Sequence, residues 1–458
     1  MAMMDFTGKL VHVIGLGPLG TGRAVARALA ARGAKVAVSD SKPAEALQTE
    51  IEALEGTGVT ILAGEEACRG IEEAELVVPS PGVPLDIPPL LRARASGAKI
   101  VSEIEVAYWL APCPIIAITG TKGKTTTTAL LGAMLRDAGV PALVGGNIGK
   151  PLIKLAEVAK PGYVLVAEVS SFQLEATEQF RPRVAVMLNL FADHLDRHET
   201  MDAYQEAKAR IFANQEADDI AVINKHDAGA WALRKLSRAR LMPFSTQQPV
   251  PEGADLVEGW LRVQGTRVCP ATNVRLRGRH NLGNVLAALA AAKAIGAPLD
   301  NARLTLAHFP GVEHRLEAIG SVGEVLFVND SQATTPPATI AALEAFEERV
   351  ILIAGGRSKV QDFDGLGEAI SRHKASLIVI GEAAEEIAAA ARNAGVTDIA
   401  HATSLPEAVE RAYQHARPGE VILMSPACAS FDMFENMSQR GRVFTETMQQ
   451  LAQREGAA

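Results

Sequence analysis

The residues best suited to chemistry form the loop Gly120-Thr-Lys-Gly-Lys-Thr125, which follows an apolar run at residues 115–118. An apolar strand that leads through glycine, lysine and threonine into a helix is the pattern of a phosphate-binding loop. The glycines let backbone N–H groups face an anion, and the helix from about Thr125 adds its positive N-terminal end. Lys124 would reach the outer phosphates, and the Thr125 hydroxyl would bind the magnesium ion that bridges them.

This loop departs from the general pattern at one position. Ile118 stands where the first glycine of the six-residue loop is expected, so the loop is a shortened form. The alternative interpretation is that Gly120 and Gly123 only turn a strand into a helix. The order of strand, Gly-Lys-Thr and helix favours phosphate binding.

A second group of candidates lies downstream. Glu168 ends an apolar strand at 163–169, and a carboxylate at a strand end beside a phosphate loop is well placed to hold magnesium. A helix-capping or surface role is the alternative. The next strand runs into Asp193-His-Leu-Asp-Arg-His198, a density of polar groups that favours metal or substrate contact over a plain loop. The helical pattern at 204–212 predicts, taken alone, a solvated side chain for Lys208.

The N-terminal segment carries a different glycine pattern. Gly15, Gly17 and Gly20 form Gly-x-Gly-x-x-Gly between a strand and a helical pattern, and Asp40 follows about 20 positions later. By this fingerprint the segment would bind NAD. The fingerprint reports only a β-turn-α unit with a ribose-reading carboxylate, however, so any nucleotide with a diphosphate fits it.

Several weaker signals are spread along the rest of the chain. A glycine-rich turn at 144–149 presents Asn147, and Asn281 and Asn284 share one helix face at i, i+3 spacing. Arg315 could reach a nucleotide. Three further polar loops follow predicted strands, at residues 329–334, 355–359 and 425–430. Each could be a plain turn, but together they indicate ligand binding.

The elements that must position these side chains are strands and helices in alternation. Strands are predicted at 35–40, 76–84, 184–190, 220–224, 325–328, 350–354, 377–380 and 421–424. The alternation predicts an α/β protein of three domains in series. These are a Rossmann-like N-terminal domain (1–108), a central P-loop ATPase-like domain with a mostly parallel sheet (109–310) and a C-terminal Rossmann-like domain (311–458). Ligands bind such sheets at the carboxyl ends of the strands.

Composition narrows the functional classes. The 458 residues suggest roughly two to four domains. With 45 Lys and Arg against 53 Asp and Glu, the net charge of −8 gives no basic footprint for nucleic acid. The four cysteines are far apart and lack metal-ligand spacing, which favours reduced thiols. Because no signal peptide and no membrane-length apolar run is present, we expect a cytoplasmic protein without a membrane partner.

Taken in order, the motifs resemble the Mur ligase family of peptidoglycan synthesis, and within it the members that add D-glutamate. The resemblance runs from Phe6-Thr-Gly-Lys to Gln-Arg-Gly441, essentially the whole chain. Its most specific stretches lie at residues 145–149, 168–175, 193–198 and 425–430. The shortened phosphate loop also resembles that of the family and of its folylpolyglutamate synthase relatives. The resemblance implies ATP-driven amide formation between UDP-N-acetylmuramoyl-L-alanine and D-glutamate through an acyl phosphate, by a monomer that uses ATP and two Mg²⁺ ions.

The resemblance also implies roles for individual residues. Catalysis would depend on Lys124, Glu168, His194 and Lys208. Metal ligands would be Thr125, Glu168, His194 and Lys208, the last as a carbamate. ATP would contact Gly120, Thr121, Lys122, Gly123, Lys124, Thr125, Thr126, Asn281, Asn284, Arg315 and Asp330. The UDP-sugar would contact Pro18, Leu19, Asp40, Ser41, Lys42, Asn147 and His194, and the incoming glutamate would contact Thr334, Lys359 and Ser430.

Two positions depart from the family pattern. Gln332 replaces the lysine of the common Asp-Ser-Lys-Ala-Thr-Asn stretch, and Met437 stands where an aromatic residue often follows the Ser-Pro-Ala-Cys motif. Both leave open a ligase that adds another amino acid or L-glutamate. An NAD-dependent oxidoreductase and a non-catalytic nucleotide-binding module are more remote alternatives, because they leave the later clusters without a role.

Overall fold

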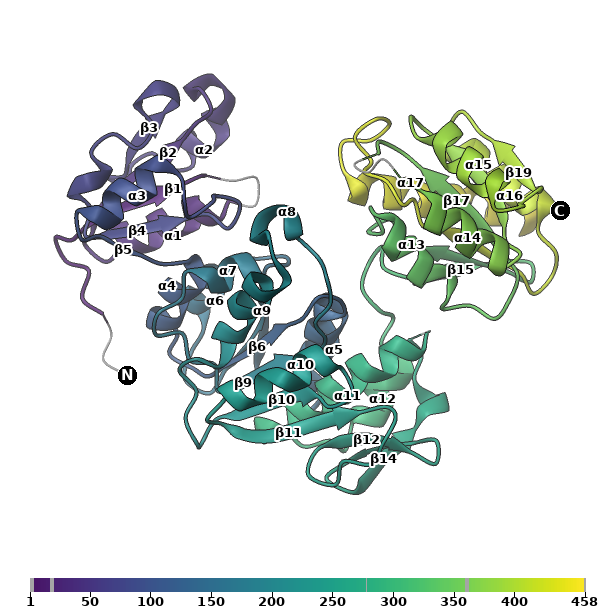
Figure 1. Cartoon of the computed structure of the whole chain (residues 1–458), viewed down its shortest axis with the longest axis horizontal. Coiled ribbons are helices and arrows are strands. Elements are labelled where there is room, and N and C mark those ends of the chain that lie inside the picture. The colour runs from purple at the N-terminus through teal and green to yellow at the C-terminus, as the bar shows by residue number, and fades with distance from the viewer. Residues whose placement is uncertain (1–3, 17–19, 277, 359–361, 457–458) are drawn as a thin grey trace. The chain divides into compact units, whose positions relative to one another are not determined.

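The computed structural model describes residues 4–16, 20–276, 278–358 and 362–456. The chain divides into two compact units (Figure 1). The first unit comprises residues 1–273 and 282–307, and the second comprises 274–281 and 308–458. The first unit holds two sheets and the second holds one. The predicted α/β architecture of three sheets in series is confirmed, while the boundaries at 108 and 310 stay predictions.

The N-terminal sheet has five parallel strands in the order β3-β2-β1-β4-β5. Its strands are β1 (Leu10–Ile14), β2 (Lys35–Asp40), β3 (Thr60–Ala63), β4 (Leu76–Pro79) and β5 (Lys99–Ile100), and its helices are α1 (Thr21–Ala30), α2 (Gln48–Glu52) and α3 (Pro88–Ala95). α1 packs so closely on the turn after β1 that a side chain at Gly22 would collide with the carbonyl of Gly15. Gly22, which lies outside the fingerprint, is therefore required for this helix–strand packing.

The central sheet has nine strands in the order β14-β13-β12-β11-β10-β9-β6-β8-β7. They are β6 (Ile115–Thr119), β7 (Ala142–Gly146), β8 (Val164–Glu168), β9 (Val184–Met187), β10 (Ile220–Asn224), β11 (Arg240–Ser245), β12 (Ala254–Val257), β13 (Trp260–Val263) and β14 (Thr266–Pro270). Pairing is parallel from β7 to β12 and antiparallel for the last two strands. The mostly parallel sheet is confirmed, and the antiparallel extension is an element that the sequence pattern did not reveal.

Helices cover this sheet and connect its strands. They are α4 (Glu103–Leu110), α5 (Lys124–Asp137), α6 (Leu152–Val158), α7 (Ser171–Glu175), α8 (Leu195–His198), α9 (Met201–Ala209), α10 (Ala228–Ala232), α11 (Arg279–Ala294) and α12 (Ala302–His308). β6 is buried along its whole length, as expected for a central parallel strand whose two faces are both covered. Its carboxyl end lies between the ends of β9 and β8, and the phosphate loop begins there.

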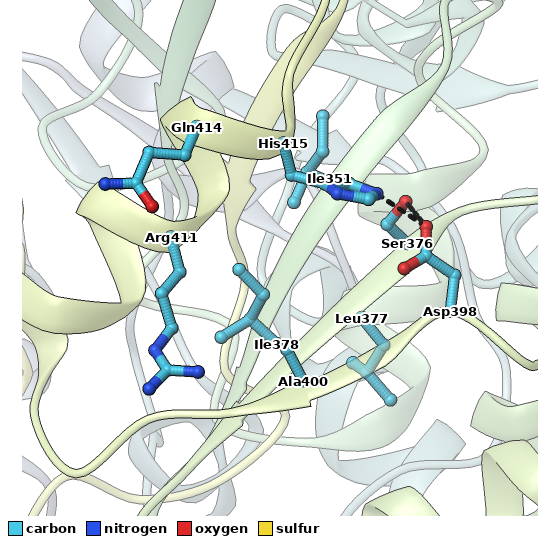
Figure 2. Close-up of a pocket in the computed structure, with 9 residues that line it drawn as sticks. All are labelled: Ile351, Ser376, Leu377, Ile378, Asp398, Ala400, Arg411, Gln414 and His415. Carbon is cyan, nitrogen blue, oxygen red and sulfur yellow. Dashed lines mark hydrogen bonds and ion pairs between the residues drawn. The ribbon is translucent and has the colours of Figure 1, made fainter.

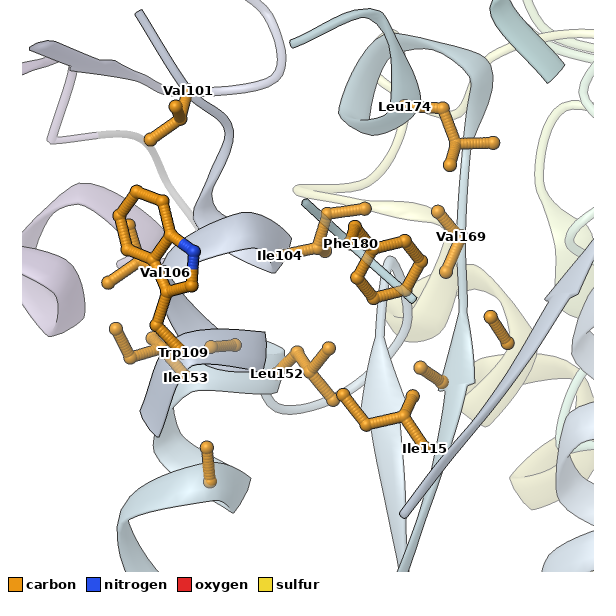
Figure 3. Packing of buried hydrophobic residues seen from close by; sticks show 14 of the residues in the cluster. Val101, Ile104, Val106, Trp109, Ile115, Leu152, Ile153, Val169, Leu174 and Phe180 are labelled. Atoms are coloured by element: carbon orange, nitrogen blue, oxygen red, sulfur yellow. The ribbon is translucent and has the colours of Figure 1, made fainter. Parts of the chain in front are cut away.

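Apolar packing joins the two sheets of the first unit through α4. Figure 3 shows Ile104, Val106 and Trp109 of α4 together with Leu152 and Ile153 of α6, all from one buried cluster that includes residues of both sheets. The Trp109 ring also lies 6.2 Å from that of Phe6. Burial of so many large apolar side chains is the main favourable term that holds these two parts in one compact unit.

The sheet of the second unit has the order β15-β16-β20-β17-β18-β19. Its strands are β15 (Glu317–Val322), β16 (Val325–Asn329), β17 (Val350–Gly355), β18 (Ser376–Ile380), β19 (Ile399–His401) and β20 (Val421–Met424), and its helices are α13 (Pro336–Leu343), α14 (Asp364–Arg372), α15 (Ala384–Asn393), α16 (Leu405–His415) and α17 (Met437–Gly456). Alternate residues of β17 point into two separate hydrophobic cores. Leu352 belongs to one core, and Ile351 and Ile353 belong to the other. Helices thus cover both faces. The sequence pattern did not predict β15, which is antiparallel to β16, or the edge strand β19.

Candidate functional site

The phosphate loop leaves β6 at Gly120 and enters α5 after Gly123. Gly123 has the left-handed φ of 87°, and a side chain there would collide with the amide oxygen of Asn284. A Cβ at Gly120 would lie 2.9 Å from that of Leu188. Both positions therefore need glycine because the loop is closely packed and sharply bent. The Lys124 ammonium donates to the carbonyls of Gly120 and Thr121, each at 2.9 Å, so this cation lies over the loop.

Glu168 lies at the end of β8 and is only 2% exposed. Asn147 donates its amide to Oε1 of Glu168 at 2.9 Å, and the backbone N–H of Asn147 donates to the Glu168 carbonyl at 2.9 Å. Oε2 is buried and has no hydrogen-bond partner among the described residues. The surface interpretation of Glu168 is wrong. A buried carboxylate oxygen without a partner is costly unless a ligand uses it, which fits a cation site.

Lys208 of α9 is 1% exposed, so the interpretation of this residue as a solvated side chain is wrong. The helix packs above the end of β6 and turns the lysine inward, where Nζ donates to the Gly120 carbonyl at 3.0 Å and approaches Thr119 Oγ1 at 3.4 Å. Burial, and next the positive charge of Lys124, lower the pKa of Lys208 to about 7. Lys208 therefore lies at the phosphate loop, and a large share of its amine is neutral near pH 7.

The polar cluster at 193–198 does not act as one group. Asp193 pairs with Lys122 at 3.4 Å, and Arg197 pairs with Glu175 at 3.0 Å. His198 is buried against the Ser171 hydroxyl at 2.9 Å, and that burial lowers its pKa. Asp196 lies outside the described side chains. Most of the cluster therefore builds the loop.

Among the described side chains of the cluster, that of His194 is the exposed one. It has a left-handed φ of 54°, and its ring meets the edge of Phe172 with centroids 5.1 Å apart. Such a backbone conformation is uncommon for a residue with a side chain and marks a fixed local bend. Its predicted contact with metal and substrate stays a prediction.

In the N-terminal sheet, Asp40 ends β2 and organises the adjacent loops. Its two carboxylate oxygens accept the backbone N–H groups of Leu16 and Lys42, each at 3.0 Å. The carboxylate thus ties the glycine-rich turn to the loop after β2, where Ser41 and Lys42 are exposed. The predicted contacts Pro18 and Leu19 lie outside the described residues.

In the second unit, polar side chains gather at the carboxyl ends of β16 and β20. Asp330 is 5% exposed and accepts the Ser425 hydroxyl at 2.8 Å and the Leu316 N–H at 3.1 Å. Burial raises the pKa of Asp330 to about 6. Nε of Arg315 is buried and has no hydrogen-bond partner in the described part of the chain. These residues form a second polar edge.

The remaining predicted contacts are distributed over both units. Thr334 is half-buried and Ser430 is buried, each in a loop that follows a strand, whereas Lys359 lies outside the described residues. Asn281 and Asn284 both lie on α11 and are both buried, which confirms their shared helix. Asn281 belongs to the second unit and Asn284 to the first, because the division between the units falls within α11.

Sequence reasoning missed Arg440 of α17, which is 1% exposed. Its guanidinium donates to the Ser331 hydroxyl at 3.0 Å, the Ser331 carbonyl at 2.9 Å and the Cys428 carbonyl at 3.1 Å. Arg440 thus ties together the loops after β16 and β20. Only its place in the Gln-Arg-Gly441 stretch could have drawn attention to it.

A pocket of about 220 Å³ opens elsewhere on the second unit (Figure 2). It lies at the amino ends of β17 and β18, where Asp398 accepts hydrogen bonds from Ser376 at 2.5 Å and His415 at 2.8 Å. Because the polar loops with Asp330 and Ser430 lie at the carboxyl ends of the strands, this pocket is separate from the candidate site.

No group of three or more His, Cys, Asp or Glu side chains among the described residues is placed to hold a metal ion. Magnesium does not need such a group, because it commonly binds one or two carboxylates together with substrate phosphates. Among these residues no helix is both long and apolar enough to cross a membrane.

Comparison with known proteins agrees with this geometry. Family models match three successive segments: the Mur ligase MurD-like N-terminal domain at 9–102, the Mur ligase middle domain at 118–292 and the Mur ligase glutamate ligase domain at 314–428. Two solved structures share the fold. A UDP-N-acetylmuramate-alanine ligase from Thermotoga maritima has a TM-score of 0.59 at 21% identity, covering 96% of this chain and 99% of its own. A MurF ligase from Thermotoga maritima in complex with ADP has a TM-score of 0.60 at 16% identity, covering 98% and 96%.

Sequence relatives are closer. A protein from Pelotomaculum thermopropionicum is 45% identical over 97% of this chain and 98% of its own length, and one from Caldanaerobacter subterraneus is 41% identical over 98% and 100%. Both are named UDP-N-acetylmuramoylalanine–D-glutamate ligase. With its matching domains in series and relatives that span its whole length, this chain belongs to the Mur ligase family.

Proposed function

We propose that this protein is an ATP-dependent ligase that joins D-glutamate to UDP-N-acetylmuramoyl-L-alanine in peptidoglycan precursor synthesis. The observation that carries the proposal is the group of Lys124, Glu168 and Lys208 around the ends of β6 and β8. Such a group suits the transfer of a phosphoryl group. The names of relatives that are 39–45% identical over nearly the whole chain support the choice of substrates.

The reaction has two steps. In the first, an oxygen of the L-alanyl carboxylate attacks the γ-phosphorus of ATP, the bond to the bridging oxygen breaks, and ADP leaves an acyl phosphate behind. In the second, the neutral amine of D-glutamate attacks the acyl carbon, inorganic phosphate leaves, and the nitrogen loses a proton as the amide forms. Both steps depend on bringing charged reactants together and offsetting their charge.

Residues of the first unit would hold the phosphates. The glycines and the first turn of α5 present N–H groups to the anion, and the Lys124 ammonium exchanges its carbonyl partners for phosphate oxygens. Glu168, through its unpartnered Oε2, and Thr125 would hold Mg²⁺. When bound, Mg²⁺ neutralises negative charge on the phosphates.

Lys208 is proposed to act as a carbamate, following the family resemblance. Carbon dioxide adds to a neutral amine, and the buried position of this lysine beside Lys124 makes the neutral form accessible. The product is an anion, which suits a second metal ion where an ammonium would repel it. His194 is proposed to contact that metal and the substrate.

The remaining proposed contacts are those with the three substrates. The UDP-sugar would be held by Pro18, Leu19, Asp40, Ser41, Lys42 and Asn147. The adenine nucleotide would be held by Asn281, Asn284, Arg315 and Asp330. The D-glutamate would be held by Thr334, Lys359 and Ser430. We further propose that the protein acts as a monomer in the cytoplasm, as the family resemblance implies.

Which amino acid the protein adds is a separate question, because two residues near the proposed amino-acid site depart from the family pattern. Gln332 donates its amide to the Glu313 carbonyl at 2.9 Å and brings no positive charge to the position where the family commonly has lysine. Met437 is 41% exposed and offers a flexible apolar surface in place of an aromatic ring. Addition of L-glutamate or another amino acid is therefore the alternative that requires a direct test.

Phosphate release by the purified protein provides that test. ATP, Mg²⁺ and UDP-N-acetylmuramoyl-L-alanine are supplied, and D-glutamate, L-glutamate and other amino acids are added one at a time. We expect release with D-glutamate alone, and loss of release in Lys124→Met but not in the exposed-site control Lys160→Met. Release with a different amino acid would show that the ligase adds that amino acid instead. No release with any of them would contradict the ligase assignment.

A further inference from the structure

Asn189 lies two residues beyond β9 and contacts the phosphate loop through both ends of its side-chain amide. Its Oδ1 accepts the backbone N–H of Lys122 at 2.8 Å, and its Nδ2 donates to the carbonyl of the same residue at 3.0 Å. The backbone carbonyl of Asn189 also accepts the N–H of Thr121 at 3.1 Å. One residue, 67 positions away in sequence, thus determines where two successive loop peptides lie.

These bonds continue the pairing of β6 with β9 beyond the ends of the strands. The regular parallel register ends where Thr119 pairs with Met187, and the Leu188 N–H then donates to the Thr119 carbonyl at 3.0 Å. The Asn189 side chain next pairs with Lys122 as a further backbone peptide would. Only a side-chain amide of this length offers both a donor and an acceptor in that geometry.

The consequence concerns which N–H groups can face a phosphate. The N–H groups of Thr121 and Lys122 are both used by Asn189, so the anion must be held by the turn at Gly123 and the first turn of α5. The first bond within that helix runs from the Thr127 N–H to the Gly123 carbonyl at 3.0 Å. Helix N–H groups before such a bond have no acceptor within the helix.

The Asn189 segment is itself held from the opposite side. Asn224 at the end of β10 donates to the Leu188 carbonyl at 2.9 Å, and the Leu190 N–H donates to Asp227 at 3.2 Å. The absence of a side chain at Gly120 allows this segment to approach the loop closely. Asn189 is therefore a fixed support rather than a mobile neighbour.

We propose that Asn189 is a positioning residue for ATP, which holds the shortened phosphate loop in the conformation that directs the N–H groups of Gly123 and the α5 N-terminus toward the phosphates. It replaces, in this loop, part of the backbone support that a longer loop would supply itself. The inference rests on the proposed ATP-dependent function and adds to it a residue that does not touch the reacting atoms.

The test compares full-length Asn189→Leu and Asn189→Ala with the wild-type protein. Leucine has nearly the same size but no polar group, whereas alanine leaves room for water to rejoin the loop. We expect the KM for ATP to rise about tenfold in Asn189→Leu, equivalent to about 1.4 kcal/mol, and less in Asn189→Ala. The KM values for UDP-N-acetylmuramoyl-L-alanine and D-glutamate should stay within about twofold, and the affinity for Mg·ADP measured by calorimetry should fall in parallel with the rise in KM for ATP.

Asn214→Leu is the matched control. Asn214 is also half-buried, and its side-chain amide also bonds the backbone of another segment: it donates to the carbonyls of Glu178 at 2.8 Å and Phe180 at 3.2 Å, neither of which belongs to the phosphate loop. We expect this control to keep the wild-type KM for ATP even if its melting temperature falls.

The possible outcomes separate the two proposals. An unchanged KM for ATP and unchanged ADP affinity in Asn189→Leu, with only reduced melting temperature, would overturn the positioning role. If the wild-type protein binds ADP but releases no phosphate, the ligase proposal fails, and the ADP affinities of the variants still decide the role of Asn189. A wild-type protein that does not bind ADP would overturn both.

Discussion

The buried carboxyl group of Glu103 should make the stability of the first unit depend on pH. Glu103 opens α4, is 1% exposed, and accepts the Ile153 N–H at 2.6 Å through Oε1. Its Oε2 is buried without a hydrogen-bond partner among the described residues. Burial, only partly offset by the N–H groups of Ile153 and Leu152, raises the pKa of Glu103 from 4.5 to about 7.

The sign and size of the effect follow from that pKa. Between about pH 4.5 and pH 7 the unfolded chain has released this proton while the folded protein keeps it. The free energy of unfolding therefore falls as pH rises through this window. The full difference corresponds to about 3 kcal/mol, of which about 2.5 kcal/mol lies between pH 5 and pH 8.

Glu103→Gln removes the ionisable proton but keeps a carbonyl oxygen for the Ile153 N–H. The free energy of unfolding of the wild type minus that of the variant should therefore fall by about 2.5 kcal/mol from pH 5 to pH 8. Urea unfolding followed by tryptophan fluorescence suits the measurement, because all three tryptophans, Trp109, Trp231 and Trp260, belong to the first unit.

The control removes the same charge at an exposed position. Glu55→Gln should show the same pH dependence as the wild type, because Glu55 lies on the surface. A difference between the wild type and Glu103→Gln that stays constant from pH 5 to pH 8, or that grows in favour of the wild type, would refute the reasoning.

Three further predictions concern the site. Lys208→Ala should lower turnover by on the order of 100-fold while ADP affinity by calorimetry and the circular dichroism spectrum stay close to wild type; near-normal turnover would exclude its proposed role. Asp40→Ala removes the carboxylate that joins the Leu16 and Lys42 amides, so the KM for the UDP-sugar should rise about tenfold with little change in that for ATP. An unchanged KM for the UDP-sugar would count against this site. Glu168→Gln keeps an oxygen for Asn147 but removes the negative charge. Phosphate release should therefore fall on the order of 100-fold across a magnesium titration. Full recovery at high Mg²⁺ would show that Glu168 is only a weak ligand.

Much of the architecture was predictable because the strands are short, continuous apolar runs. The predicted bounds 220–224 and 421–424 match β10 and β20, and the predicted strand at 35–40 matches β2. Parallel strands covered on both faces have this continuous pattern, so few other structures fit it. The antiparallel strands β12 to β15 and the parallel strands β3, β5, β7, β11 and β19 were missed. Most of these strands are short and part-exposed, so they carry a weaker and more polar signal.

The candidate site divides in the same way. Lys124 and Glu168 were identified from local order, since Lys124 begins the helix after the loop that follows β6 and Glu168 ends β8. For the cluster at 193–198, the density of polar groups did not show that Arg197 and His198 contact neighbouring segments, and the predicted ligand contact of His194 stays a prediction.

The sequence by itself determined the alternation of strands and helices, the shortened phosphate loop and the membership of a ligase family, because these depend on residues that are close in sequence. Only the tertiary structure decided that Lys208 is buried, that Asn189 holds the loop and that Arg440 joins two strand-end loops. Those contacts link residues 88, 67 and 109 positions apart. Burial and hydrogen-bond partners at such separations arise only when the sheet brings its strand ends together, which no local pattern encodes.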